Sequence, residues 1–381
     1  MKIFYLITIF SFGFFQSTAQ IENLSEKFAL PTLLNESSGA IFFNDKLITH
    51  NDSGGENKLY ELDTITGLIT RTVTVSNATN VDWEDLAEDE NFIYVGDIGN
   101  IGSRTDLKIY KIDKNDFVKT TEVLAEIINF NYANQSDFTS NPGNTEWDAD
   151  ALVSIDQNNL ALFSKDWVEN ESRAYLIPKK PGSYSISPMA TSYNGGGLVT
   201  GATYNPTNGK LFLVGYQNLS SGLKSLQAYV TIFENFTLDD IFSGTNTQYD
   251  LPSFGPEDAE AITYVNKTNR YFITSETFSG TLFGITFSDY GKLIAFSYKN
   301  NTLSISESSQ IQISLYPNPV SDVLTIEHQD FEFVEIYDGS MSLVQKSYQS
   351  QINMSGLSQG IYFLKINLKG QNPVFKKILK N

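Results

Sequence analysis

Acidic residues recur at one position of a repeated block in this sequence, and they are the first candidates for chemistry. Five blocks align between about residues 36 and 300, and they begin at Ser38, Trp83, Ala149, Thr200 and Ala259. The second residue of each block is, in the same order, Gly39, Glu84, Asp150, Gly201 and Glu260. If the blocks surround one axis, three carboxylates converge there, and the hydroxyls of Ser38 and Thr200 lie between them. Like charges held this close raise one another's pKa unless a cation neutralises them.

Calcium is the cation that suits this set of side chains. It takes about six to eight oxygen ligands of mixed type and tolerates irregular geometry. The predicted ligands are Ser38, Glu84, Asp150, Thr200 and Glu260. Zinc is disfavoured, because the chain has two histidines, His50 and His328, and no cysteine. The alternative is a hydrated acidic channel that holds no metal.

A second group of polar residues follows the second hydrophobic segment of each block, where loops should surround the same axis. The candidates for catalysis are His50, Asp52, Asp97 and Glu276. The candidates for ligand binding are Asn51, Trp83, Arg104, Trp147, Lys165 and Tyr216. Each has a structural alternative: the two aspartates are good turn residues, a lone histidine is often part of a core, and the tryptophans can wedge between sheets. The sequence has no Ser-His-Asp order, phosphate-binding glycine loop or metalloprotease motif.

The elements that must position these residues are β-strands. The chain has 20 Tyr and 27 Phe but only 4 Met, which favours pleated sheets over helix bundles. Each block continues into three more strand-like segments, and a unit of about 50 to 60 residues with four antiparallel strands is typical of a propeller blade. The fold class predicted is all-β, with a five-bladed β-propeller followed by a small C-terminal β-sandwich. Residues 25–30 should close the ring by joining the last blade; if they head a hidden unit, the propeller has six blades.

The two ends of the chain differ from the repeats. Lys2, an apolar run over 3–15 and the small residues before Gln20 indicate a signal peptide over 1–19, rather than an uncleaved anchor. We expect the propeller over 20–303, a linker over 304–312 and the sandwich over 313–381. No segment of the mature chain is long enough to span a membrane as a helix. The formal net charge of -18 makes nucleic acid an improbable partner, because its phosphates would be repelled.

The C-terminal 70 or so residues resemble a known family. The matching motifs are Tyr316-Pro317-Asn318-Pro319, Val334-Glu335-Ile336-Tyr337-Asp338, the stretch over 353–363 and the basic end Lys376-Lys377-Ile378-Leu379-Lys380. They look like the type A C-terminal sorting domain of the type IX secretion system. The resemblance implies export across the outer membrane with the type IX machinery as partner, leaving the protein released or attached to surface polysaccharide. An ordinary accessory sandwich is the alternative.

The blocks that begin at Ser38 and Glu84 resemble blades of the calcium-activated apyrase family. That family has five blades and one calcium ion, held by side chains in the order Ser, Glu, Glu, Ser, Glu. The resemblance implies the same five calcium ligands named above. Asp150 takes the place of a Glu and Thr200 that of a Ser, and both still offer an oxygen ligand. The nucleotide-binding part matches less well: residues 50–55 lack the arginine of the family's turn, and its arginine pair has no counterpart near 164–167.

Two functions follow from these observations. The first is a secreted or cell-surface binding protein, stabilised by calcium, that holds a ligand or surface polymer at its loops. The second is a calcium-dependent hydrolase of phosphorylated or phosphodiester-type substrates, in which an acid such as Asp52 activates water. A purely structural surface protein would not need the polar loops.

Overall fold

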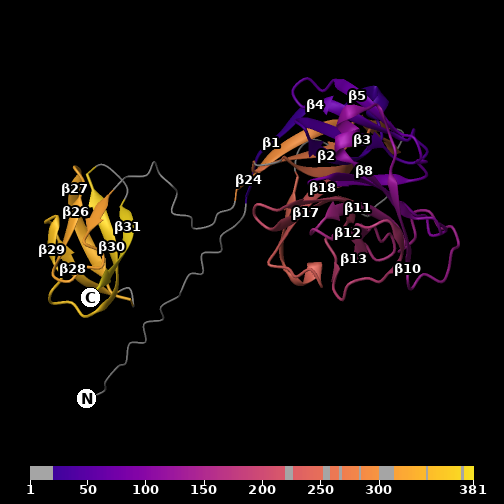
Figure 1. Cartoon of the computed structure of the whole chain (residues 1–381). Helices are drawn as coiled ribbons and strands as arrows, with labels where there is room; N and C mark the ends of the chain where they lie inside the picture. Colours follow the sequence, from indigo (N-terminus) through magenta and orange to yellow (C-terminus); the bar gives the residue numbers. More distant parts are fainter. Residues whose placement is uncertain are drawn as a thin grey trace, which may run out of the picture. The chain divides into compact units, whose positions relative to one another are not determined.

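The computed structural model describes residues 20–218, 226–251, 258–265, 268–282, 285–299, 313–339, 342–369 and 373–381. The predicted signal peptide and linker lie outside these residues. The chain divides into two compact units, Met1–Asn301 and Thr302–Asn381. Both consist almost entirely of β-strands, as predicted (Figure 1).

Five sheets of four or five strands account for most of the described part of the first unit. The first sheet contains β2 (Ser37–Phe43), β3 (Lys46–Asn51), β4 (Lys58–Asp63), β5 (Ile69–Val75) and β9 (Glu122–Val123). The second contains β6 (Trp83–Glu88), β7 (Phe92–Asp97), β8 (Lys108–Asp113), β10 (Glu126–Tyr132) and β14 (Gly182–Ile186). The third contains β11 (Ala149–Ser154), β12 (Asn159–Ser164), β13 (Ser172–Pro178) and β15 (Ser192–Tyr193).

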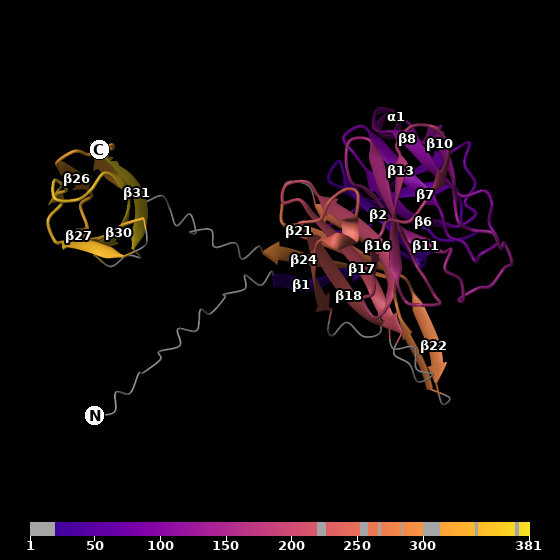
Figure 2. The same cartoon turned by 90° about the horizontal axis from the view of Figure 1, so that it is seen from below.

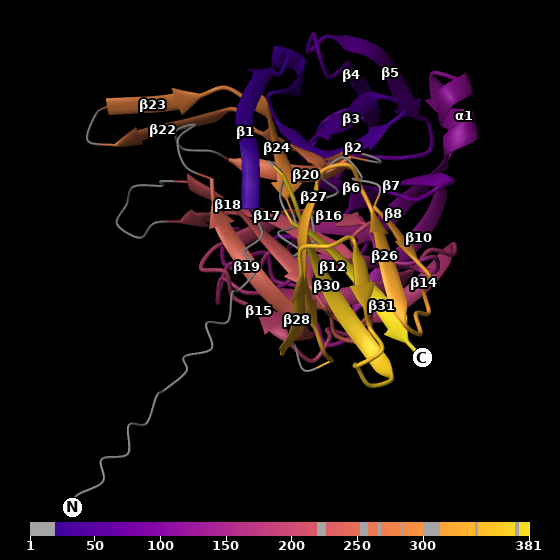
Figure 3. The ribbon, with the colours of Figure 1, turned by 90° about the vertical axis from the view of Figure 1, so that its left-hand side faces the viewer.

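The remaining elements of this unit complete the pattern. The fourth sheet contains β16 (Leu198–Asn205), β17 (Lys210–Asn218), β18 (Leu226–Glu234) and β19 (Thr245–Asp250). The fifth contains β20 (Ala259–Val265), β21 (Arg270–Ser275), β24 (Lys292–Lys299) and β1 (Gln20–Ala29). The helices are α1 (Lys114–Lys119) and the 3-10 turns η1 (Thr32–Leu34) and η2 (Ile241–Ser243). A hairpin of β22 (Phe278–Leu282) and β23 (Ile285–Asp289) extends away from the sheets (Figures 2 and 3).

The ends of the unit meet in the fifth sheet. β1 pairs antiparallel with β24, so the N-terminal strand joins the sheet of the last repeat. This is the pairing that the sequence predicts for residues 25–30. The short strands β9 and β14 likewise leave their own repeat and pair in parallel with β5 and β10 of the preceding sheet. These exchanges tie neighbouring sheets together through the backbone.

The first strands of the five sheets lie next to one another. Each contacts its two neighbours, in the order β2, β6, β11, β16, β20 and back to β2, and β6 also contacts β16. Their backbones approach so closely that two positions require glycine: a Cβ on Gly39 would lie 2.6 Å from the Leu86 nitrogen, and one on Gly201 would lie 2.5 Å from the Glu260 carbonyl oxygen.

Every first strand is interrupted by a β-bulge at the same place. The unpaired residues are Ser38 and Gly39, Glu84 and Asp85, Asp150, Thr200, and Glu260. A bulge re-aims the side chains of a strand and is frequent next to functional sites. The bulges also correct the sequence alignment: Thr200, not Gly201, occupies the position equivalent to Asp150 and Glu260.

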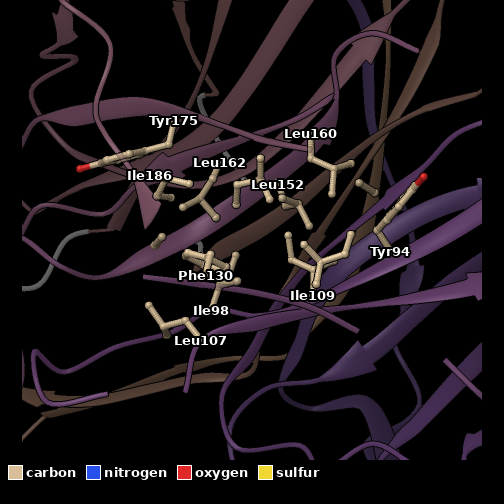
Figure 4. Close-up of a cluster of buried hydrophobic side chains, with 14 of the residues drawn as sticks. Tyr94, Ile98, Leu107, Ile109, Phe130, Leu152, Leu160, Leu162, Tyr175 and Ile186 are labelled. Carbon is tan, nitrogen blue, oxygen red and sulfur yellow. The ribbon is translucent and has the colours of Figure 1, made fainter. Parts of the chain in front are cut away.

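Apolar side chains fill the spaces between adjacent sheets. Figure 4 shows one such cluster, in which Ile109 and Phe130 of the second sheet face Leu162 and Tyr175 of the third. Equivalent clusters lie between the other neighbouring sheets. This packing holds the first strands, and therefore their bulges, in fixed positions.

The second unit is a small β-sandwich. One sheet contains β25 (Ser314–Tyr316), β26 (Val323–Glu327) and β29 (Gln351–Asn353). The other contains β28 (Leu343–Ser347), β27 (Phe331–Tyr337), β30 (Gly360–Leu368) and β31 (Val374–Lys380). Inward-facing residues such as Leu324, Ile336 and Leu364 form its core. In the described part of the chain, no helix has the length and hydropathy to cross a bilayer.

Candidate functional site

The five predicted metal-binding residues all lie at the bulges of the first strands. Glu84, Asp150 and Glu260 are buried, and so are the two hydroxyl residues. The hydroxyls serve a structural purpose: Ser38 Oγ donates to the Glu84 carbonyl at 2.7 Å, and Thr200 Oγ1 donates to the Ala259 carbonyl at 2.6 Å. Each bond links two neighbouring first strands. The hydroxyl oxygens keep lone pairs that a cation could still use.

Three further aspartates, which the sequence analysis did not select, lie beside the bulge carboxylates. Asp82, Asp148 and Asp258 each stand two residues before one of the three bulge carboxylates. Side chains two residues apart in a β-strand point to the same face. Carboxylate oxygens lie within 4.8 Å of one another in three groups: Asp52, Asp82 and Glu84; Glu84, Asp148 and Asp150; Asp258, Glu260 and Glu276. The recurring pattern of an acid, any residue and an acid was the sequence signal for this cluster, which we call the acidic mouth.

Lys165 supplies a buried positive charge inside the acidic mouth. It follows β12, and its ammonium forms an ion pair with Asp150. Burial alone would lower the pKa of Lys165, but Asp150, Tyr216, Glu260 and Glu84 raise that pKa well above its usual value. The ammonium also lies 5.2 Å from the ring centre of Trp167 and 5.7 Å from that of Tyr216. Lys165 was predicted to bind a ligand; the structure places it as the internal counter-ion of the carboxylates.

Eight different carboxylates make up the three groups, since Glu84 is shared by two of them. Burial, followed by the neighbouring charges of Asp150 and Asp52, raises the pKa of Glu84 well above its usual value. Burial, together with other carboxylates, raises the pKa of Asp52 to about 6 and that of Asp82 to about 7. One ammonium therefore does not compensate the negative charge that this cluster would carry at neutral pH.

Two features of the acidic mouth suit an added cation. Asp150 is buried, and among the described residues its Oδ1 atom has no hydrogen-bond partner; Asp258 Oδ1 has none there either. Gly99 leaves space beside the acids, because a Cβ there would run into Glu84 Oε1 and lie 2.5 Å from Asp82 Oδ2. An unpaired buried carboxylate oxygen is costly unless a cation or donor meets it.

The tryptophans divide between the core and the acidic mouth. Trp83 is fully buried, donates from Nε1 to the Thr79 carbonyl at 3.1 Å and packs against His50 and Tyr110. Trp147 is partly buried against Tyr132. Trp167 donates from Nε1 to Asp148 Oδ2 at 2.8 Å and packs partly buried beside Tyr216. The tryptophan beside the carboxylates is thus Trp167, whereas Trp83 packs in the core between two sheets.

His50 lies in the core beneath the site. Its Nδ1 is 2.9 Å from the Asn51 carbonyl oxygen, and its Nε2 lies against Gly39 with no hydrogen-bond partner among the residues described. Burial lowers the pKa of His50 to about 4, so the ring is neutral at physiological pH. Asn51 donates from Nδ2 to the Leu33 carbonyl. These contacts hold both residues in place within the fold.

Asp97 and Arg104 form a buried ion pair, with Arg104 NH1 2.9 Å from Asp97 Oδ1. The same carboxylate oxygen accepts from the Asp82 backbone nitrogen at 3.0 Å. Arg104 also contacts Asp106 at 3.1 Å. The pair therefore anchors the loop before β6. Of the predicted catalytic acids, the structure brings Asp52 and Glu276 into the acidic mouth and places Asp97 behind it.

Comparison with known proteins identifies the C-terminal unit. Residues 314–381 match the family model of the secretion system C-terminal sorting domain. This confirms the predicted type IX sorting domain, and the protein is secreted or attached to the outer cell surface. No curated protein matches the chain.

Solved structures match the strand arrangement only loosely. The extracellular domain of a putative hybrid two-component system from B. thetaiotaomicron is 10% identical, with a TM-score of 0.33, over 93% of this chain and 50% of that one. The chain thus spans half the length of that relative. The major allergen of Malassezia sympodialis is 12% identical (TM-score 0.39; 74% of this chain, 94% of that one). An α-L-arabinanase from Penicillium chrysogenum, complexed with arabinobiose, is 9% identical (TM-score 0.41; 74% and 99%).

Proposed function

We propose that residues 20–303 form a five-bladed β-propeller that binds calcium at its acidic mouth and a ligand at the surrounding loops. The five sheets of four or five strands in the described part of the first unit, and the cyclic order of contacts among their first strands, support the propeller. In this proposal the sorting domain engages the type IX secretion machinery, and the propeller is the exported cargo. Its ligand is a small molecule or a surface polysaccharide.

The observation that carries the calcium proposal is the grouping of Glu84, Asp148 and Asp150. Their oxygens lie within 4.8 Å of one another, and the buried Asp150 Oδ1 has no hydrogen-bond partner in the part of the chain that the structure describes. Glu84 also belongs to the group with Asp52 and Asp82, so it is the shared ligand of the proposed site. An all-oxygen set of carboxylates is what calcium prefers. A bound ion would supply positive charge that holds three sheets together and orients oxygen atoms of a ligand.

The ligand side of the proposal rests on the ends of the second strands. Asp52, Lys165, Tyr216 and Glu276 all come from these ends and gather around the carboxylates. Trp167 adds an aromatic surface beside Lys165. Polar groups that converge on a partly apolar concave surface are typical of small-molecule sites.

Chelation tests the proposal. The melting temperature of the purified full-length protein should fall when EGTA replaces calcium, because binding to the folded state alone stabilises it. An unchanged melting temperature would show that calcium does not stabilise the folded protein. Ligand binding that persists without turnover of nucleotides or phosphodiesters would favour the binding protein over the hydrolase.

The pH dependence of stability should reveal the uncompensated acids. Because the pKa of Asp52 is raised to about 6 and that of Asp82 to about 7, these two groups bind more protons in the folded protein than in the unfolded chain above about pH 4. In EGTA the melting temperature should therefore fall by several degrees between pH 4.5 and pH 7.5. Calcium should abolish most of this slope, and Asp82→Asn should reduce it. A melting temperature that stays constant or rises over this range in EGTA would contradict the interpretation.

Substitution of Gly99 should weaken the proposed site without touching a ligand. In Gly99→Ala the added methyl group would run into Glu84 Oε1 and Asp82 Oδ2. We expect the calcium affinity, measured by isothermal titration, to fall at least tenfold. Gly339→Ala is the control, because a Cβ there meets no atom within 4 Å. Equal affinities of the two variants would place the cation elsewhere.

A hydrolase is the second candidate, and the raised pKa values of Asp52 and Asp82 favour it. A carboxyl group whose pKa lies near the working pH can accept a proton from water. Release of phosphate from nucleotides or phosphodiesters that is lost in Asp52→Asn would support this function. No turnover of the whole panel by the calcium-loaded protein would exclude it for these substrates.

A further inference from the structure

A second concave site lies at the other ends of the first strands. A cavity of about 790 Å³ is lined by residues of all five strands β2, β6, β11, β16 and β20. Its lining begins after the bulges, at residues such as Ala40, Leu86 and Ala202, and ends in the turns that follow the strands. The carboxylates of the acidic mouth lie at the bulges and before them. The cavity and the acidic mouth therefore share no residue of the five strands.

Asp85 closes the region between the two sites. Its buried carboxylate accepts from the backbone nitrogens of Leu86 at 2.8 Å, Leu152 at 2.9 Å and Ala202 at 3.3 Å. These nitrogens belong to three different first strands. The close approach of strands at Gly39 and Gly201 narrows the same region. A molecule in the cavity would not contact the acidic mouth.

One wall of the cavity is a fixed network of charged groups. Lys114 Nζ contacts Glu88 Oε2 at 2.5 Å, and Lys179 Nζ contacts Asp89 Oδ2 at 2.9 Å and Ser154 Oγ at 2.7 Å. Both lysines are buried. These are two ion pairs, joined by the Asp89 carbonyl oxygen, which accepts from Lys114 Nζ at 2.5 Å, so the four charged side chains are neutral as a group. It offers donors and acceptors in fixed positions, as a preorganised polar surface does.

Other parts of the lining are aromatic. Phe43, Tyr204 and Tyr264 line the cavity together with Pro206. Tyr204 is partly exposed, whereas Tyr264 is largely buried and packs in a tilted arrangement against Tyr271, with the ring centres 5.6 Å apart. Aromatic faces present a large apolar surface that suits the C–H faces of a ring. The cavity thus combines polar groups with flat apolar ones, and its volume is in the range of small-molecule sites.

We propose that this cavity binds a neutral, polyhydroxylated ligand, namely a short oligosaccharide. Hydroxyl groups of a ligand can donate to Glu88 and accept the remaining N–H of Lys114, while a sugar ring packs on Tyr204. All three N–H groups of Lys179 are used by Asp89, Ser154 and the Asp156 carbonyl, so this lysine fixes the wall. An anionic ligand is disfavoured, because both lysines are already paired with carboxylates. The exposed Glu90 at the rim adds negative charge. The proposal is independent of calcium binding at the acidic mouth.

The test is a binding measurement on the full-length protein with defined oligosaccharides. Gluco-, xylo-, manno- and galacto-oligosaccharides of about two to six units are the probes, with inorganic phosphate and pyrophosphate alongside them. We expect at least one oligosaccharide to bind in isothermal titration, with the same affinity in calcium and in EGTA. Tyr204→Leu should weaken this binding at least tenfold. Gln157→Ala, in an exposed turn at the rim, is a second variant that preserves the fold.

Tyr184→Leu is the matched control, because Tyr184 is partly buried like Tyr204 but lies on β14, outside the cavity. It should leave the affinity unchanged. Absence of binding to the whole saccharide panel would overturn the proposal, and so would binding that neither Tyr204→Leu nor Gln157→Ala weakens. Binding of phosphate or pyrophosphate that competes with the saccharide would overturn the assignment of a neutral ligand. Saccharide binding that disappears in EGTA would move the site to the acidic mouth.

Discussion

Replacing Lys165 with methionine is expected to lower the free energy of unfolding of the calcium-free protein by about 3–5 kcal/mol at pH 7. The side chain is buried, its ammonium pairs with Asp150, and the carboxylates of Glu84 and Glu260 lie close enough to raise its pKa. Methionine keeps the length and packing of the lysine but removes its charge. The buried carboxylates would then repel one another without an internal counter-ion. Urea unfolding in EGTA measures the loss.

The same substitution should raise the affinity for calcium, although it lowers the stability of the calcium-free protein. Removal of a positive charge from the acidic mouth should tighten calcium binding at least tenfold, and calcium should restore most of the lost stability. Lys180→Met is the control, because Lys180 is exposed next to the buried Lys179. A loss below about 1 kcal/mol in EGTA, the range of an exposed ion pair, would show that Lys165 is not the counter-ion of the cluster.

Asp85→Ala should lower the free energy of unfolding by a similar amount, about 3–5 kcal/mol. The substitution leaves the buried backbone nitrogens of Leu86, Leu152 and Ala202 without their acceptor, and each unpaired buried group costs roughly 1–3 kcal/mol. It also removes a link between three first strands. Calcium should not restore this loss, because the Asp85 carboxylate is committed to those nitrogens.

The comparison for Asp85 is Asp239→Ala, at an exposed turn. Urea unfolding of both variants, with and without calcium, separates the two effects. A change below about 0.5 kcal/mol in Asp85→Ala, as for an ordinary surface substitution, would mean that the three bonds do not hold the strands together. A full recovery in calcium would instead make Asp85 a part of the metal site.

Much of the fold could be predicted from repetition in the sequence. The five blocks recur with a constant order of strands, and each maps onto the first strand of a described sheet. The residues before Pro31 could be assigned to the last sheet, because the last repeat lacks one strand and the N-terminal segment can supply it. The exchanges of β9 and β14 could not be predicted, since two to five residues carry no signal for the neighbour with which they pair.

The site was predicted in its outline but not in its details. Glu84, Asp150 and Glu260 were found because they align, yet only the bulges decide that Thr200 rather than Gly201 stands beside them. Lys165 looked like an ordinary loop cation, because its burial depends on the packing of Trp167 and Tyr216. Trp83 was placed at the site for its position next to Glu84, but alternate residues of a strand face opposite sides, and Trp83 faces the core.

Anomalous scattering from crystals of the protein grown with calcium tests the central claim most directly. We expect a peak at the acidic mouth, with oxygens of Glu84 and of Asp150 or Asp82 within about 2.3–2.6 Å of it. The carboxylates of these residues should point at the ion, and the Lys165 ammonium should stay on the far oxygen of Asp150. Crystals without a peak there, in which Lys165 alone neutralises the cluster at millimolar calcium, would contradict the account.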